Sequence, residues 1–168
     1  DVFSAPALER VFNIKARPPG LALPVLVSCW DQVEVVAQDF PKAARDLAER
    51  FWPGPLTLVL PKAPEISDRV TGGRDTVAVR MPDHQVPLEL ARQLGRPISG
   101  TSANRSGEPE LSTVGAVEAG LGADVDYIIR SGPAPEGAPS TVVDLTAGTP
   151  RLVRQGVVPF EDILAVYV

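Results

Sequence analysis

Short apolar runs and amphipathic stretches alternate along this chain, and proline or glycine separates most of them. Residues 56–60 and 76–81 have the length and the flanking breaks of buried strands, whereas residues 44–51 place their apolar side chains at helical spacing. The order of these segments does not follow the strict strand–helix–strand rhythm of a purely parallel sheet. We therefore predict an α/β (α+β) fold, with a twisted mixed β-sheet flanked by helices.

The other predicted elements are bounded by caps, prolines and glycines. Ser4 is an N-cap for a helix that has Pro6 in its first turn and ends within Lys15-Ala16-Arg17-Pro18-Pro19-Gly20. Further helices are expected at residues 31–36, 88–94, 112–121 and 160–168. Strands are expected at residues 23–29, 97–99, 127–130, 141–145 and 151–153, the last two as a hairpin around Gly148.

The bulk composition narrows the class of protein. The 168 residues fit one domain, and no internal repeat or low-complexity linker divides them. A net charge of −5 argues against a bulk nucleic-acid binder, although it leaves room for a local basic pocket. A single cysteine cannot form an internal disulfide, and no apolar run reaches the length of a membrane helix. We expect a cytoplasmic protein without a membrane partner.

Several familiar sites are excluded by residue type. One histidine and one cysteine cannot supply the usual zinc spacings, so we expect no protein-bound metal. The sequence has neither a Gly-x-x-x-x-Gly-Lys-Ser/Thr loop nor a Gly-x-Gly-x-x-Gly turn. If the protein binds a nucleotide, it therefore uses a different binding motif.

The segment Gly100-Thr101-Ser102-Ala103-Asn104 is the strongest local indication of a binding site. It lies where an apolar stretch ends and a polar, glycine-containing loop begins. Small residues let the backbone approach a ligand closely, and serine and asparagine offer both donors and acceptors. The segment is typical of a site for a small polar group such as a phosphate or a carboxylate.

Cations and hydroxyl groups gather at the ends of predicted elements: Lys15 and Arg17, Arg80, Arg154 and Ser140-Thr141. Each has a purely structural explanation as well, as a helix-dipole partner, a solvated arginine or a turn residue. Together they indicate a ligand site, because sheet proteins bind ligands at element ends. Two or three charge-assisted hydrogen bonds, each contributing roughly 1.5–3 kcal/mol, suffice for micromolar binding of a triphosphate.

A hydrolase is a competing interpretation, because Ser102, His84 and Asp83 are the residue types of a nucleophile triad. Two features argue against it. Asn104 stands where a nucleophile elbow needs a second glycine. Asp83 and His84 are also adjacent in sequence, so their side chains tend to diverge.

Six motifs resemble, in order, those of the YrdC-like threonylcarbamoyl-AMP synthases, and the similarity covers essentially the whole chain. They are Lys15-Ala16-Arg17-Pro18, Phe51-Trp52-Pro53-Gly54-Pro55-Leu56-Thr57, Val79-Arg80-Met81-Pro82, Thr101-Ser102-Ala103-Asn104-Arg105-Ser106-Gly107, Pro139-Ser140-Thr141-Val142-Val143-Asp144 and Leu152-Val153-Arg154-Gln155-Gly156.

The resemblance implies an L-threonylcarbamoyladenylate synthase, a nucleotidyltransferase. It implies that L-threonine, bicarbonate or CO2, and ATP, usually with Mg2+, give threonylcarbamoyl-AMP and pyrophosphate. A downstream threonylcarbamoyl transferase complex would then modify tRNA, with which this protein could also be in contact.

The resemblance also implies roles for individual residues. Lys15 and Arg17 would be catalytic and hold the ATP phosphates. The nucleotide site would comprise Arg17, Leu21, Thr76, Ser102, Asn104, Glu110 and Arg154. The threonine pocket would comprise Arg80, Gly100 and Ser140, with Gly100 contributing its backbone.

The chain departs from the family pattern at three places. Family members usually begin with a strand and a Pro-Thr-Asp/Glu-Thr-Val-Tyr-Gly motif, which would precede Asp1, so we expect the single domain at residues 1–168 to be N-terminally incomplete. Leu21-Ala22 replace a common Asn-Pro, and Glu110 replaces a small hydroxyl residue.

Two alternatives remain. One is a non-catalytic RNA- or nucleotide-binding module of the same fold. The other is the related carbamoyl-adenylate domain of hydrogenase maturation, which occurs in longer chains with zinc-finger-like cysteines that this sequence lacks.

Overall fold

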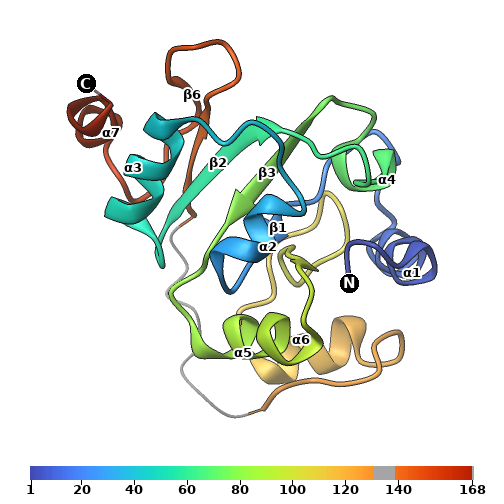
Figure 1. Ribbon diagram of the computed structural model, residues 1–168. Helices are drawn as coiled ribbons and strands as arrows, with labels where there is room; N and C mark the ends of the chain where they lie inside the picture. The colour runs from blue at the N-terminus through green and yellow to red at the C-terminus, as the bar shows by residue number, and fades with distance from the viewer. Residues whose placement is uncertain (131–138, 168) are drawn as a thin grey trace.

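A six-stranded mixed sheet forms the centre of the computed structural model, which describes residues 1–130 and 139–167 (Figure 1). The strands are β1 (Val25–Leu26), β2 (Leu56–Pro61), β3 (Thr76–Arg80), β4 (Ile98–Ser99), β5 (Thr141–Asp144) and β6 (Arg151–Arg154). Their order is β4-β1-β3-β2-β5-β6. The β1–β3 and β2–β5 pairs are parallel and the others antiparallel, which confirms the predicted mixed sheet.

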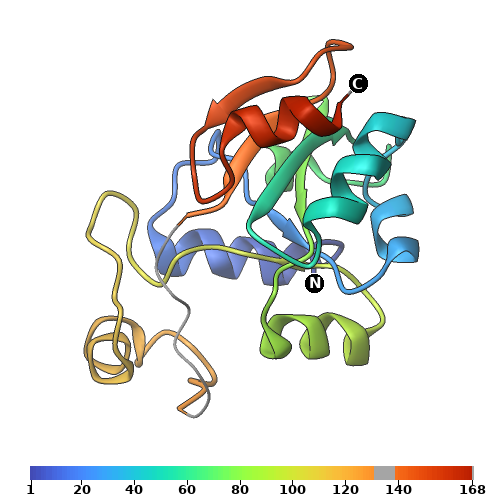
Figure 2. The same cartoon turned by 90° about the vertical axis from the view of Figure 1, so that its left-hand side faces the viewer.

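Seven helices surround the sheet in the part of the chain that the structure describes. They are α1 (Ala5–Lys15), α2 (Trp30–Glu34), α3 (Lys42–Phe51), α4 (Asp68–Thr71), α5 (Gln85–Leu94), α6 (Val114–Leu121) and α7 (Phe160–Val166). Figure 2 shows α2 and α3 together on one side, and α6 set apart on the other. None of these helices has the length and apolar character required to cross a membrane.

The two faces of the sheet have different burial. On β2 and β3, the side chains of Leu58, Leu60, Val77 and Val79 are almost fully buried, and they alternate with half-buried positions such as Ala78. Strand side chains point alternately to opposite faces, so this pattern separates a buried face from an open one. Each buried leucine stabilises the fold by about 1.5–3 kcal/mol relative to an exposed one.

Helix α3 covers the buried face with its apolar stripe. Ala44, Leu47 and Ala48 are fully buried and belong to the same hydrophobic cluster as the strand residues. The Gln32 side chain of α2 donates a hydrogen bond to the carbonyl of Ala91, which joins α2 to α5. We call the face bearing Thr76, Ala78 and Arg80, opposite α3, the open face.

The end of α1 is fixed by its local sequence. Ser4 is the predicted N-cap, and its hydroxyl accepts from the Ala7 amide. At the other end Ala16 adopts a left-handed conformation (φ 47°) that stops the helix directly after Lys15. Arg17 then lies at the start of the following loop, so one helix end presents two cations to the candidate site.

Most predicted elements are confirmed, including the helix capped by Thr113 and the β5–β6 hairpin. The strand predicted at residues 127–130 is wrong: the segment is irregular and Tyr127 is 82% exposed. The run at 23–29 forms a strand only at Val25–Leu26, and α2 spans Trp30–Glu34 instead of the predicted residues 31–36. Helix α4 was not predicted, and position 168 lies outside the described residues.

Candidate active site

Strand register places two arginines on the open face. Leu26 pairs with both Arg80 and Ile98, and Val142 pairs with both Thr57 and Arg154. One step from the Leu58–Val79 pair, Thr57 lies opposite Arg80. A single row therefore crosses all six strands in the order Ile98, Leu26, Arg80, Thr57, Val142 and Arg154. Paired side chains point to the same face, so both guanidinium groups lie on the open face.

Within the described ranges one hydrogen bond anchors the Arg80 side chain, which leaves its other N–H groups for a further partner. Its Nε donates to the Gly54 carbonyl at 2.8 Å, and the side chain is half-buried. Burial, and secondly the nearby charge of Arg154, lowers the pKa of Arg80. No carboxylate of the described residues forms an ion pair with either arginine. Two like charges without an anionic partner make a suitable site for a ligand anion.

Arg154 is held by the first residue before β5. Its Nη2 donates to the Ser140 carbonyl at 2.9 Å and to Ser140 Oγ at 3.1 Å, while its Nε lies 3.2 Å from the same carbonyl. Ser140 Oγ is also 2.8 Å from Thr57 Oγ1. The predicted threonine residue Ser140 and the predicted nucleotide residue Arg154 are thus in direct contact.

Because residue 156 is a glycine, the segment that follows β6 can pass very close to the backbone of Ser140. A Cβ atom at position 156 would lie 2.3 Å from the Pro139 carbonyl oxygen and 2.3 Å from the Ser140 carbonyl carbon. Thr141 Oγ1 accepts from the Gly156 amide at 3.0 Å and donates to the Val158 carbonyl at 2.7 Å. The close crossing fixes the backbone of Ser140 and hence the position of Arg154.

Lys15 holds the second part of the site, the loop that begins at Gly100. The lysine is 4% exposed, and its Nζ donates to the Ser102 carbonyl at 2.6 Å, the Asn104 carbonyl at 2.7 Å and Asn104 Oδ1 at 3.0 Å. An ammonium has three N–H groups, so all of them are engaged. Burial and then the charge of Arg17 lower the pKa of Lys15, and Glu110 acts in the opposite direction.

The Ser102 and Asn104 side chains complete this network. Ser102 Oγ donates to Asn104 Oδ1 at 2.7 Å, and Asn104 Nδ2 donates to the Glu108 carbonyl at 2.6 Å. The hydrolase interpretation loses its support, since the Ser102 hydroxyl donates to an amide oxygen. His84 instead caps α5, where its Nδ1 accepts from the Val86 amide at 3.2 Å.

Arg17 contacts the loop that contains the Leu21-Ala22 departure. Its Nη2 donates to the Ala22 carbonyl at 2.6 Å and its Nε to the Leu21 carbonyl at 3.3 Å. Burial lowers the pKa of Arg17. Because the acceptors are main-chain oxygens, this loop orients Arg17 regardless of the side chains at these two positions.

Gly100 joins the two parts of the site. Its amide donates to the Pro24 carbonyl at 2.8 Å, next to β1, and the chain then leads to Ser102. A Cβ at this position would lie 2.9 Å from Leu26 Cδ1, so the open face has no room for a side chain there. Thr76 lies on the same face as Arg80, four residues earlier on β3. Within the described ranges no hydrogen bond or ion pair links Thr76 or Glu110 to another predicted site residue, although the charge of Glu110 acts on the pKa of Lys15.

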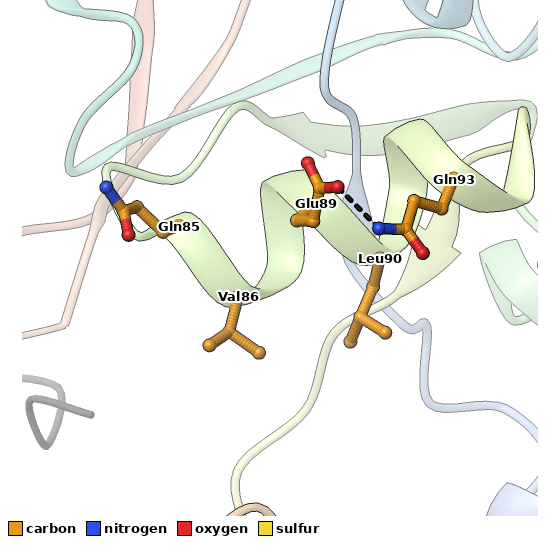
Figure 3. A pocket seen from close by; sticks show the side chains of 5 residues that line it. All are labelled: Gln85, Val86, Glu89, Leu90 and Gln93. Atoms are coloured by element: carbon orange, nitrogen blue, oxygen red, sulfur yellow. Dashed lines mark hydrogen bonds between the residues drawn. The ribbon is translucent and has the colours of Figure 1, made fainter. Parts of the chain in front are cut away.

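A separate groove of about 370 Å3 runs along α5 (Figure 3). Its lining residues are Gln85, Val86, Glu89, Leu90 and Gln93. Hydrogen bonds from Arg92 and Gln93 lower the pKa of Glu89 to about 2. None of the predicted site residues lines this groove, so its size alone does not make it the active site.

The comparison with known families agrees with this arrangement. The family model described as "Telomere recombination", which represents the Sua5, YciO and YrdC proteins, matches residues 1–156. The chain belongs to this family. The predicted resemblance is confirmed, and with it the expected fold.

Three relatives show how far the similarity extends. The chain is 44% identical to threonylcarbamoyl-AMP synthase of Pyrococcus abyssi over 94% of its length and 40% identical to that of Bacillus subtilis over 95%. It spans 46% of each of these relatives, about half their length. The crystal structure of P. abyssi Sua5 complexed with L-threonine superposes with a TM-score of 0.92 at 42% identity, covering 99% of this chain and 49% of that one.

Sequence reasoning missed two members of the site, both in the motif that begins at Phe51. The Gly54 carbonyl anchors Arg80, and the Thr57 hydroxyl contacts Ser140. The sequence shows that this motif resembles the family pattern but predicts no role for it. A signal was present, because a threonine within an otherwise apolar strand is a buried hydroxyl that needs a partner.

Proposed function

We propose that the chain forms the catalytic domain of an L-threonylcarbamoyladenylate synthase, which makes threonylcarbamoyl-AMP and pyrophosphate from L-threonine, bicarbonate or CO2, and ATP. The observation that carries the proposal is the site itself: Arg80 and Arg154 share the open face without a carboxylate partner among the described residues, beside the loop held by Lys15. The similarity to synthases of two organisms supports it.

Each part of the site has a proposed substrate. Arg80 pairs with the carboxylate of L-threonine, and Gly100 and Ser140 line the same pocket. The nucleotide lies against the remaining predicted residues, which are Arg17, Leu21, Thr76, Ser102, Asn104, Glu110 and Arg154. The contact between Ser140 and Arg154 would place the two substrates next to each other.

The chemistry needs positioning and charge neutralisation more than covalent catalysis. The amine of L-threonine adds to CO2 and loses a proton, which gives a carbamate. A carbamate oxygen then attacks the α-phosphorus of ATP in line, and pyrophosphate leaves. Arg17 neutralises phosphate charge directly. Lys15 contributes its charge while its N–H groups hold the Ser102–Asn104 loop.

Mg2+ would enter with ATP as part of the substrate. Among the described residues, no group of three or more His, Cys, Asp or Glu side chains is arranged to hold a metal ion. The product is a reactive mixed anhydride, so a transferase that modifies tRNA would consume it. We place this pathway in the cytoplasm, with tRNA contact made by that complex or by this protein.

The test is pyrophosphate release by the purified protein. Release that requires L-threonine and bicarbonate together is the expected result. ATP turnover that is indifferent to L-threonine would refute the proposal. Tight, salt-sensitive tRNA binding without ATP binding would instead favour a non-catalytic module.

A further inference from the structure

Thr57 is a buried hydroxyl residue at the centre of the open-face row. It is 4% exposed and lies between Arg80 and Val142 in the strand register. Within the described residues, the one hydrogen-bond partner of its Oγ1 is Ser140 Oγ, at 2.8 Å. The reaction proposed above assigns no role to Thr57.

The donors and acceptors around Ser140 determine the direction of this hydrogen bond. A serine hydroxyl has one proton and two lone pairs. Nη2 of Arg154 can only donate, so it occupies one lone pair of Ser140 Oγ. The buried proton of Thr57 needs an acceptor, and Ser140 Oγ is the acceptor within reach in the described structure. Thr57 therefore donates and fills the second lone pair.

Both lone pairs of Ser140 Oγ are then occupied, so its hydroxyl can interact with a ligand only as a hydrogen-bond donor. We propose that Thr57 is a positioning residue that makes the Ser140 hydroxyl a hydrogen-bond donor toward the amino-acid substrate. The inference rests on the proposed function, because it takes L-threonine as the ligand of Ser140. A donor at this point selects a carboxylate or hydroxyl oxygen and disfavours a group that presents an N–H.

The turn before β2 supports a positioning role in a second way. Residues 54 and 57 of one short motif hold two different side chains of the site: the Gly54 carbonyl accepts from Arg80 Nε, and Thr57 contacts Ser140. Ser140 in turn holds Arg154. The turn and the first residues of β2 thus set the positions of the two guanidinium groups relative to each other.

The experiment compares two substitutions of Thr57, one that removes its hydroxyl and one that removes its methyl group. Thr57→Val keeps the branched shape but removes the donor, and Thr57→Ser keeps the hydroxyl. Calorimetry with L-threonine is expected to show about fivefold weaker binding for Thr57→Val, which corresponds to one neutral hydrogen bond, and less than twofold weaker binding for Thr57→Ser. The affinity for ATP changes less than twofold, because Arg154 keeps the main-chain oxygen of Ser140.

A double-mutant cycle with Ser140→Ala separates this role from a general loss of packing. If Thr57 acts through Ser140, Thr57→Val has no further effect on L-threonine binding in the Ser140→Ala background. Equal effects in both backgrounds, or equal effects of Thr57→Val and Thr57→Ser, would overturn the inference, as would a wild-type protein that does not bind L-threonine. Thermal unfolding verifies that each variant is folded.

The same measurements keep the two proposals distinguishable. A wild-type protein that binds L-threonine but releases no pyrophosphate would refute the synthase activity, and the Thr57 comparison would still be readable from binding. Pyrophosphate release with unchanged L-threonine affinity in Thr57→Val would refute the role of Thr57 alone.

Discussion

The two parts of the candidate site are built in different ways. The sheet part comprises Arg80 on β3, Arg154 on β6 and Ser140, which directly precedes β5; the intervening strands β2 and β5 keep β3 and β6 in register. The loop part comprises residues 100–108, which have no strand partners beyond Gly100 and depend on contacts with α1. Lys15 supplies three of those contacts through one ammonium group.

This difference predicts which part of the site depends more on a single side chain for its structure. In the sheet part each side chain is positioned by backbone pairing that survives the loss of any one side chain. In the loop part three main-chain and side-chain acceptors share one buried cation, so its loss weakens the bonding of the Ser102 carbonyl and Asn104 Oδ1 and leaves the Asn104 carbonyl without a donor among the described residues. We therefore expect the sheet part to lose affinity locally and the loop part to lose structure.

The largest effect is expected for Lys15→Met. Removing the ammonium takes three hydrogen bonds from the loop and leaves the buried Asn104 carbonyl without a donor among the described residues, and such an unsatisfied group costs about 1–3 kcal/mol. We expect the free energy of unfolding to fall by about 3 kcal/mol, measured by urea denaturation. The matched control is Lys42→Met, whose ion pair with Asp46 is at the surface, and which should leave the free energy of unfolding almost unchanged. Equal losses in the two variants would contradict the comparison.

The next largest effect is expected for Arg80→Ala, and it is on binding. If Arg80 is the proposed partner of the L-threonine carboxylate, its loss should weaken L-threonine binding by about 30-fold, or about 2 kcal/mol. Calorimetry measures this, with Arg92→Ala as the control because Arg92 is exposed and pairs with Glu89. An unchanged affinity in Arg80→Ala would remove Arg80 from the threonine pocket.

A smaller effect is expected for Asp144→Asn, next to the sheet part. Burial by itself acts to raise the pKa of Asp144, but hydrogen bonds from Thr146 and Arg151 outweigh it and lower the pKa below its usual value. A lowered folded-state pKa stabilises the protein above the unfolded pKa of about 3.9, and the contribution is lost as the pH falls through the folded pKa. We expect Asp144→Asn to cost about 1 kcal/mol at pH 7.

The pH dependence checks that prediction. The difference in unfolding free energy between wild type and Asp144→Asn should narrow as the pH is lowered below about 4, because the wild-type carboxylate then becomes protonated. Denaturation curves between neutral and acidic pH measure it. A difference that stays constant across this range would show that the charge of Asp144 makes no contribution.

The smallest effect is expected for Arg10→Ala. Arg10 joins α1 to the segment after α6 through an ion pair with Asp126, and the two side chains are 51% and 78% exposed. Exposed pairs contribute about 0.2–1 kcal/mol and are screened by salt. Thermal unfolding should shift by a small amount that disappears in high salt. A loss of stability as large as that of Lys15→Met would mean that the segment after α6 also stabilises the loop part of the site.

The sequence predicted the sheet part better than the loop part. Val77 and Val79 alternate with Thr76, Ala78 and Arg80, so the strand and its two faces follow from periodicity. The partners of Lys15 do not follow from any local pattern, because Asn104 is far away in the chain. A basic residue at a helix end looks the same in sequence whether it faces solvent or a buried carbonyl. The roles given to the site residues remain predictions.

The wrong strand at 127–130 has a physical explanation. Tyr127, Ile128 and Ile129 have strong strand propensity, yet a strand also requires a neighbour with free backbone groups. Tyr127 is 82% exposed, and Arg130 pairs with Glu118 of α6 instead. The strand propensity of these residues shows only that they are compatible with a strand. The segment does not form one, because no strand among the described residues pairs with it.

Core and ligand-facing side chains alternate within the same strands. The register of each strand therefore determines both which side chains are buried and which side chains face the ligand. A single inserted or deleted residue in β3 would turn Arg80 toward the apolar interior and Val79 toward solvent at the same moment. One such change in β3 would therefore reduce both the stability of the protein and its ligand binding. Length changes in this family are therefore expected to be confined to loops, while β3 varies only by substitution.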